Sequence, residues 1–144
     1  MTQEEKDLLI NDICARLQYG VKVAYLESVY DVEYIEPDYD EIKLQNVDYT
    51  VVIDEVKPYL RNMNSITEEE LAELKEATCP NGTGTFNKEA LLCPMSHWGE
   101  VIPYKFMDSI ISWLDAHFFD HRGLIPLGLG IWVTEKNNPY KSEK

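Results

Sequence analysis

The chain has 144 residues, 44% of them hydrophobic, and a formal net charge of −13. A chain of this length can bury about two-thirds of its unfolded surface, so we expect one domain with one core over residues 1–134. No apolar run approaches the roughly 18 residues of a membrane span, and an acidic start is not typical of a signal peptide. The three cysteines, Cys14, Cys79 and Cys93, favour a reducing environment. These features predict a soluble, cytoplasmic protein that does not act at a membrane.

The negative charge is concentrated in one segment of the chain. Residues 27–55 hold ten acidic residues against the single base Lys43, which gives this segment a net charge of −9. Such a field repels nucleic-acid phosphates and favours a basic protein partner, so we expect no direct nucleic-acid binding. Imitation of DNA by rows of carboxylates is a special case of this hypothesis, and a solvated surface without a partner is the alternative. The candidate partner-binding residues are Asp31, Glu33, Glu36, Asp38, Asp40 and Glu41.

The first predicted element is a helix over residues 3–19. Thr2 and Glu5 have the spacing of a capping box, and Gly20 suits a left-handed stop. The apolar side chains recur at helical spacing on one face, at Leu9, Ile10, Ile13, Cys14 and Leu17. A helix with a single apolar face must lie on another layer of structure.

The next segment changes to a period of two, which is typical of strands. Four extended runs follow one another with short connections, at residues 21–25, 30–35, 41–45 and 49–55. Short connections between strands predict an antiparallel meander, and the fold class is therefore α+β. We expect four to five strands within residues 21–56, in an open sheet or a half-closed small barrel.

The sheet is expected to end before Pro58, because proline denies the ladder a hydrogen-bond donor. A second capping box at Thr67–Glu70 predicts a peripheral helix over residues 67–77. Residues 79–101 contain prolines and glycines that break any period, apart from one helical turn at residues 88–92. A loop of this length is either functional or an expendable elaboration.

The clearest helical period lies in residues 103–122. Its aromatic and aliphatic side chains fall on one face, with Pro103 suited to the first turn and Gly123 suited to a left-handed C-cap. This helix and the first one are expected to cover the sheet. An edge strand is expected near residues 130–134, and residues 135–144 are expected to form a disordered tail.

Scattered segments that cover about half of the chain carry a resemblance. They are Lys57–Arg61 with Met63, Ser65 and Thr67–Glu70; Trp113-Leu114 with His117, Phe119-Asp120 and Arg122–Ile125; and Arg16-Leu17 with Tyr19–Val23. In these segments the chain resembles a family of small uncharacterised proteins carried by prophages and other mobile elements of gut anaerobic bacteria. The resemblance implies a bacterial or phage intracellular setting, and it implies no catalytic residues.

Two histidines raise an alternative function. His117 and His121 lie four residues apart within the predicted helix, which is the spacing with which two imidazoles share a metal ion. Phe118 stands where a helical zinc motif of the protease type has glutamate, and the sequence fixes no third ligand. Asp120, or the loop of residues 79–97, would complete the ligand set of a metal-dependent enzyme or metal-binding protein. Packing within the core is the simpler interpretation of the pair.

The acidic segment is also rich in tyrosine, with Tyr25, Tyr30, Tyr34, Tyr39 and Tyr49. Beside carboxylates these rings, together with Trp98, suit a recognition surface, whereas tyrosine is also a common strand residue. Phe119 lies on the polar side of the predicted helix, so we expect it to contact the segment 123–133 or a partner.

The sequence carries no glycine-rich phosphate loop, nucleophile elbow or paired-carboxylate signature. The spacing of Cys79 and Cys93 matches no common zinc motif. No cofactor is therefore predicted. The leading interpretation is a non-enzymatic binding protein, an accessory or host-modulating factor of a mobile element, that contacts a basic protein partner through its acidic surface.

Overall fold

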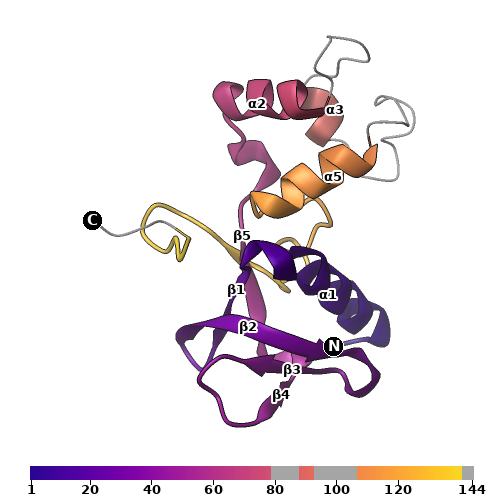
Figure 1. The fold of residues 1–144 in the computed structure, drawn as a ribbon, viewed down its shortest axis with the longest axis vertical. Helices are drawn as coiled ribbons and strands as arrows, with labels where there is room; N and C mark the ends of the chain where they lie inside the picture. Colours follow the sequence, from indigo (N-terminus) through magenta and orange to yellow (C-terminus); the bar gives the residue numbers. More distant parts are fainter. Residues whose placement is uncertain (79–87, 93–106, 141–144) are drawn as a thin grey trace. The chain divides into compact units, whose positions relative to one another are not determined.

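The chain folds into two compact units, one of Met1–Arg61 with Arg122–Lys144 and one of Asn62–His121. The computed structural model describes residues 1–78, 88–92 and 107–140. The first unit contains a sheet and one long helix, and the described elements of the second unit are helices (Figure 1). The predicted α+β class is therefore confirmed.

The first unit is built on one open, six-stranded sheet in the order β4-β3-β2-β1-β5-β6. Its strands are β1 (Lys22–Tyr25), β2 (Ser28–Glu36), β3 (Glu41–Leu44), β4 (Thr50–Val52), β5 (Lys57–Leu60) and β6 (Ile131–Trp132). The strands β1 to β4 form the predicted antiparallel meander. β5 extends the sheet beyond residues 21–56, and β6, which runs parallel to β5, confirms the edge strand expected near residues 130–134. The sheet is therefore mixed rather than antiparallel, and it does not close into a barrel.

The prediction that the sheet ends before Pro58 is wrong. Pro58 lies in β5, opposite Val23 of β1. In an antiparallel ladder, pairs whose backbone groups face each other alternate with pairs whose groups point away. In the next pair along, the Lys22 N–H and the Tyr59 carbonyl are bridged by one hydroxyl, so these two groups face each other. In the Val23–Pro58 pair the backbone groups therefore point away from each other. A residue at position 58 would donate no hydrogen bond to β1, so proline there removes no bond of this ladder.

The first helix covers one face of this sheet (Figure 1). It consists of α1 (Gln3–Arg16) followed by the 3₁₀ turn η1 (Leu17–Tyr19), and Gly20 stops it at a φ of 80°. The predicted capping box is confirmed, with bonds of 2.9 and 3.1 Å between Thr2 and Glu5. Buried side chains of the helix and of the inner sheet face form the core: Leu9, Ile10, Ile13, Val23, Ile42, Leu44, Val51 and Ile53. Cys14, which was expected on the buried face of the helix, is exposed.

The second unit packs helices around a hydrophobic core of its own. Its described elements are η4 (Met63–Ser65), α2 (Glu68–Thr78), α3 (Lys88–Leu92) and α5 (Met107–Ala116). The core consists of Ile66, Leu74, Leu91, Ile110, Leu114 and Phe119. The capping box predicted for α2 is confirmed, because Thr67 and Glu70 exchange two backbone-to-side-chain bonds of 3.1 Å. The helical turn predicted at residues 88–92 is α3.

The helix with the clearest period ends earlier than its pattern indicates. α5 ends at Ala116, and Phe118 turns the chain with a positive φ of 62°. The Phe118 N–H donates to the Asp115 carbonyl at 3.1 Å, and the Phe119 N–H donates to the Leu114 carbonyl at 2.9 Å. These two bonds are those of a Schellman motif, which satisfies the last carbonyls of a helix. The stop is therefore built at Phe118 rather than at a glycine.

The early stop changes the predictions for this segment. Residues 117–122 are not helical, and Gly123, which was expected to cap the helix, has its positive φ in a later turn. Phe119 does not lie on a polar face, because it is fully buried and stacks on Trp113 with ring centroids 6.0 Å apart. Pro103, the expected first turn, lies outside the described residues. The apolar face of α5 contributes to the core of the second unit.

One buried carboxylate joins the two chain segments of the first unit. Asp12 of α1 is fully buried, and so is Arg16 one turn later. Arg16 donates from Nε to Asp12 Oδ2 and from Nη2 to Asp12 Oδ1, both at 3.0 Å. Arg122, which enters the first unit from the other end of the chain, donates from Nη1 to Asp12 Oδ1 at 2.7 Å. Removing the shared carboxylate would leave two guanidinium groups without this counter-charge.

We predict that Asp12→Ala lowers the free energy of unfolding by about 3–5 kcal/mol, because it breaks a buried, hydrogen-bonded charge network. Urea unfolding followed by circular dichroism measures the change. The matched control is Asp7→Ala on the same helix, whose exposed side chain accepts one hydrogen bond from Gln3. The control should cost less than about 1 kcal/mol, and equal losses in both variants would contradict the role of Asp12.

Candidate binding surface

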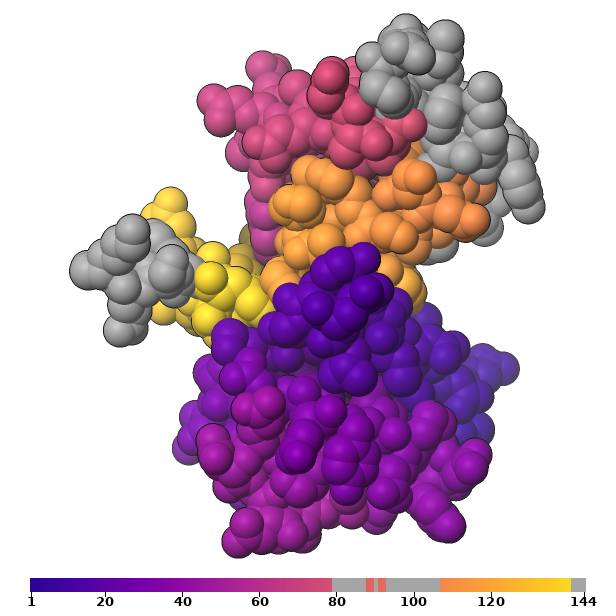
Figure 2. Space-filling view, viewed as in Figure 1, coloured from indigo at the N-terminus to yellow at the C-terminus, as the bar shows by residue number. Residues whose placement is uncertain are grey.

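The strands β2, β3 and β4 bury one face and expose the other. Ile42 and Val51, which pair across β3 and β4, are buried on the inner side. The opposite side carries two cross-strand rows, Tyr34–Lys43–Thr50 and Glu36–Glu41–Val52. These six residues are called the outer face. In Figure 2 the atoms of this part of the chain, coloured purple to magenta, form one continuous surface.

The acidic residues that were predicted to bind a partner differ in their surroundings. Asp31 accepts a hydrogen bond from Lys22 Nζ at 2.7 Å, and Glu33 accepts one from Lys43 Nζ at 3.1 Å. These two charges are therefore neutralised within the sheet. The other four, Glu36, Asp38, Asp40 and Glu41, have no lysine, arginine or histidine partner among the residues that the structure describes.

The four unneutralised carboxylates gather at one end of the outer face. Glu36 of β2 lies directly opposite Glu41 of β3, a position in which like charges destabilise a sheet. The 3₁₀ turn η2 (Pro37–Tyr39) connects these strands and adds Asp38, and Asp40 follows it with a positive φ of 52°. The structure therefore brings together four of the six predicted residues, and it separates Asp31 and Glu33 from them by pairing each with a lysine.

Exposed apolar side chains lie beside these carboxylates. Tyr34 and Val52 on the outer face are 42% and 45% exposed, and Tyr39 in η2 is 72% exposed. Tyr25, by contrast, is buried and packs against Tyr30 with ring centroids 6.0 Å apart. The predicted aromatic set thus divides into surface and core members. Val52 was missed by the sequence analysis, although its alternation with buried neighbours carries the signal.

The two histidines of the metal hypothesis do not share a helix. Because α5 ends at Ala116, His117 and His121 lack the helical geometry on which the hypothesis depends. His117 Nδ1 lies 2.8 Å from the Trp113 carbonyl oxygen, and its ring stacks on the Trp113 indole with centroids 3.8 Å apart. His121 is buried, with Nε2 2.7 Å from Asp115 Oδ1. Each histidine therefore makes local contacts of its own around the end of α5.

Residues 1–78, 88–92 and 107–140 contain no group of three or more His, Cys, Asp or Glu side chains placed to hold a metal ion. Cys79, Cys93 and Trp98 of the sequence analysis lie outside these ranges, as does His97, the last residue of the loop that was expected to complete the ligand set. Within the same ranges, no helix combines the length and the apolar character that crossing a bilayer requires.

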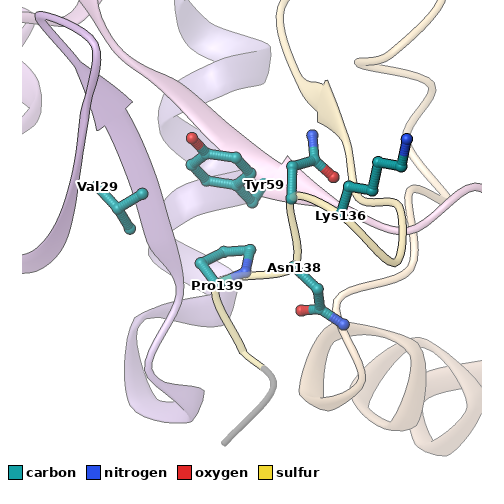
Figure 3. Close-up of a pocket in the computed structure, with 6 residues that line it drawn as sticks. Val29, Tyr59, Lys136, Asn138 and Pro139 are labelled. Carbon is teal, nitrogen blue, oxygen red and sulfur yellow. The ribbon is translucent and has the colours of Figure 1, made fainter. Parts of the chain in front are cut away.

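A shallow depression of about 250 Å³ lies beside the C-terminal segment of the first unit (Figure 3). It is lined by Val29, Tyr59, Lys136, Asn137, Asn138 and Pro139. In Figure 3, Val29, Tyr59 and Pro139 lie together, whereas the Lys136 side chain extends away from them. Sites for small molecules usually have volumes of about 300–1,000 Å³ and bury most of their ligand. The depression is too small and too open for such a site.

The same segment, which the sequence assigns to a disordered tail, is attached to the sheet through Tyr140. The Tyr140 hydroxyl accepts from the Lys22 N–H at 3.0 Å and donates to the Tyr59 carbonyl at 2.9 Å. It stands between β1 and β5 where a direct bond of the ladder would otherwise form. Burial raises the pKa of this hydroxyl, which keeps its proton available for donation. The composition of the segment gave no signal for this contact.

Comparisons with family models, with curated proteins and with solved structures found no match. The outer face places exposed apolar area of Tyr34 and Val52 beside carboxylates, and tyrosine is among the residue types that are enriched in protein interfaces.

We predict that Tyr140→Phe lowers the free energy of unfolding by about 1–3 kcal/mol at neutral pH, because two backbone groups lose their bridging partner. Thermal or urea unfolding measures the loss. The matched control is Tyr39→Phe, which removes an exposed hydroxyl and should change stability by less than about 0.5 kcal/mol. A loss for Tyr140→Phe as small as that of the control would contradict the bridging role.

Tyr140→Phe should also change how the free energy of unfolding depends on pH above about 10. Since the pKa of Tyr140 is raised in the folded state, the unfolded chain releases this proton first, and stability falls as the pH rises above about 10. In Tyr140→Phe this fall should be less steep by up to about 1.4 kcal/mol per pH unit. Part of the fall should remain, because a hydrogen bond with Tyr49 raises the pKa of Tyr25 to about 12. An unchanged slope would contradict the assignment.

Proposed function

We propose that this protein is a non-enzymatic binding protein that contacts a basic protein partner through the outer face and the turn η2. The observation that carries the proposal is the pair of Glu36 and Glu41, which face each other across two strands without a cation. A sheet optimised for stability alone would place a lysine at one of these positions, as β3 does at Lys43 beside Glu33. The uncompensated pair is explained if the missing cation comes from a partner.

The surroundings of the pair support the same function. Tyr34, Tyr39 and Val52 supply exposed apolar area next to the charges, which is the mixture that a protein interface uses. Lys43 is held in place by Glu33 and by the Leu44 carbonyl, which its Nζ approaches at 2.8 Å. The carboxylates therefore stand on an ordered sheet. The resemblance to proteins of mobile elements favours an accessory role inside a bacterial cell.

Imitation of DNA is less well supported than binding of a basic protein surface. A DNA mimic needs rows of carboxylates that approximate the spacing of phosphates. On this sheet the row is interrupted, because Lys22 pairs with Asp31 and Lys43 pairs with Glu33. The alternative of a metal-dependent enzyme required His117 and His121 on one helix, and α5 ends before both of them. No other observation on the described residues favours this alternative.

We predict that Glu36→Lys weakens partner binding about tenfold or more while it raises the free energy of unfolding by about 0.2–1 kcal/mol. The new lysine would pair with Glu41 across the strands and leave the Thr50 hydroxyl bond to Glu41 intact. Binding is measured with a partner captured from bacterial lysate on the immobilised chain at low salt, and stability by urea unfolding.

The matched control is Glu76→Lys, an exposed charge reversal in α2 with the same effect on net charge. It should bind as the unmodified chain does, within about twofold. If Glu36→Lys weakens partner binding while it raises the free energy of unfolding, the loss of binding is not caused by a loss of stability. Unchanged binding in Glu36→Lys, or binding that ignores salt between about 0.05 and 0.5 M, would contradict the proposed function.

A further inference from the structure

One edge of the sheet is left open, and it borders the outer face. β4 pairs with β3 on one side, and no strand described by the structure pairs with its other side. The Ile53 N–H donates to the Asp40 carbonyl at 2.8 Å, which identifies Ile53 as a position whose backbone faces β3. Since such positions alternate along an antiparallel strand, Val51 also faces β3, whereas Thr50 and Val52 point their N–H and C=O groups away from the sheet.

The other edge of the sheet differs, because the chain covers part of it. At β6, the Trp132 carbonyl accepts a hydrogen bond from Asn137 Nδ2 at 3.1 Å. Asn137 is held in the same turn, since its Oδ1 accepts from the Thr134 hydroxyl at 2.8 Å. Unpaired edges bind other chains unless they are covered. The open groups of β4 are therefore the ones available to another chain.

Charge decides what kind of chain can lie along β4. Asp48 precedes the strand, and Asp54 and Glu55 follow it, all three of them exposed. A second copy paired antiparallel about the centre of β4 would place Asp48 of each copy near Asp54 and Glu55 of the other, beside the charges of Glu36 and Glu41. Like charges in such positions repel, so the acids act against self-association. The same charges attract an extended segment that carries lysine or arginine.

We propose that the open edge of β4 binds an extended basic segment of the partner by strand addition. This inference rests on the proposed function and names the part of the partner that the surface takes. The segment adds antiparallel to β4 and exchanges backbone hydrogen bonds with Thr50 and Val52. The residue of the added segment that lies opposite Val52 points its side chain to the outer face. Two strand spacings of about 4.8 Å each, from the segment to β4 and from β4 to β3, separate it from Glu41. A lysine or arginine at that position spans this distance and supplies the missing cation.

The probe is a synthetic peptide of arginine and valine in alternation, acetyl-Thr-Arg-Val-Arg-Val-Arg-Thr-amide. With its arginines on the outer face, their N–H groups point to β4 and the valine N–H groups point to solvent. Methylating the three arginine amides therefore blocks strand addition, whereas methylating the two valine amides keeps it, at the same charge. Titration calorimetry on the full chain should give about tenfold or more weaker binding for the first analogue than for the second.

The matching variant on the protein is Val52→Pro. Val52 has a φ of −70° and a ψ of 142°, which proline adopts, and its N–H lies on the open side of β4. Val52→Pro should therefore keep its fold and its whole acidic surface, and bind the unmethylated peptide about tenfold or more weakly. The matched comparison is Val52→Thr, which changes the same side chain but keeps the N–H, and it should bind the peptide about tenfold or more tightly than Val52→Pro does.

The outcomes separate this inference from the proposed function. If Val52→Pro and the methylated analogues all bind equally well while Glu36→Lys loses binding, the acidic surface is confirmed and strand addition is wrong. If Glu36→Lys also binds unchanged, both proposals are wrong. A dimer of the unmodified chain that Val52→Pro dissociates, seen by analytical ultracentrifugation, would show a second copy on the edge and overturn the inference.

Discussion

The first unit depends on the buried carboxylate of Asp12. It accepts three hydrogen bonds, two from Arg16 on its own helix and one from Arg122, which lies 110 residues further along the chain. A buried charge is tolerated only where it is paired and hydrogen-bonded, so these contacts specify one arrangement of the helix and the C-terminal segment. That segment supplies β6 and the Tyr140 bridge, which together complete the side of the sheet away from β4.

The C-terminal segment extends one side of the sheet, whereas β4 is the last strand on the other side. From β2 to β4 the pleat sends Ile42 and Val51 inward and the outer face to solvent. Lysines neutralise the acids in the middle of the sheet, whereas those around Glu36 and Glu41 are left without a cation. A charged surface and an open edge therefore meet at the same strands. In the proposed complex, charge attracts a basic segment from a distance, and backbone pairing selects an extended one at contact.

Local signals in the sequence predicted local structure well. Both capping boxes and the antiparallel pairing of β1 to β4 are confirmed, because each depends on residues close together in the chain. The end of α5 was misjudged because the apolar period continues through residues that lie beyond the Schellman turn. Pro58 was misjudged because its effect depends on register with β1, and Tyr140 because it bonds to residues about 80 and 118 positions away. The acids of the candidate site were predicted, but the open edge of β4 follows from strand order, which a single sequence does not display.

The central claim is that the outer face and the open edge of β4 form one binding surface. Amide NMR spectra of the full ¹⁵N-labelled chain, recorded while the arginine–valine peptide is added, test it most directly. The account predicts that the largest shift changes fall on Thr50, Val52 and residues 36–41, with slowed hydrogen exchange at the Val52 amide. Shift changes centred on Val29 and Pro139 at the C-terminal depression, or spread evenly over the acidic residues of both units, would contradict it.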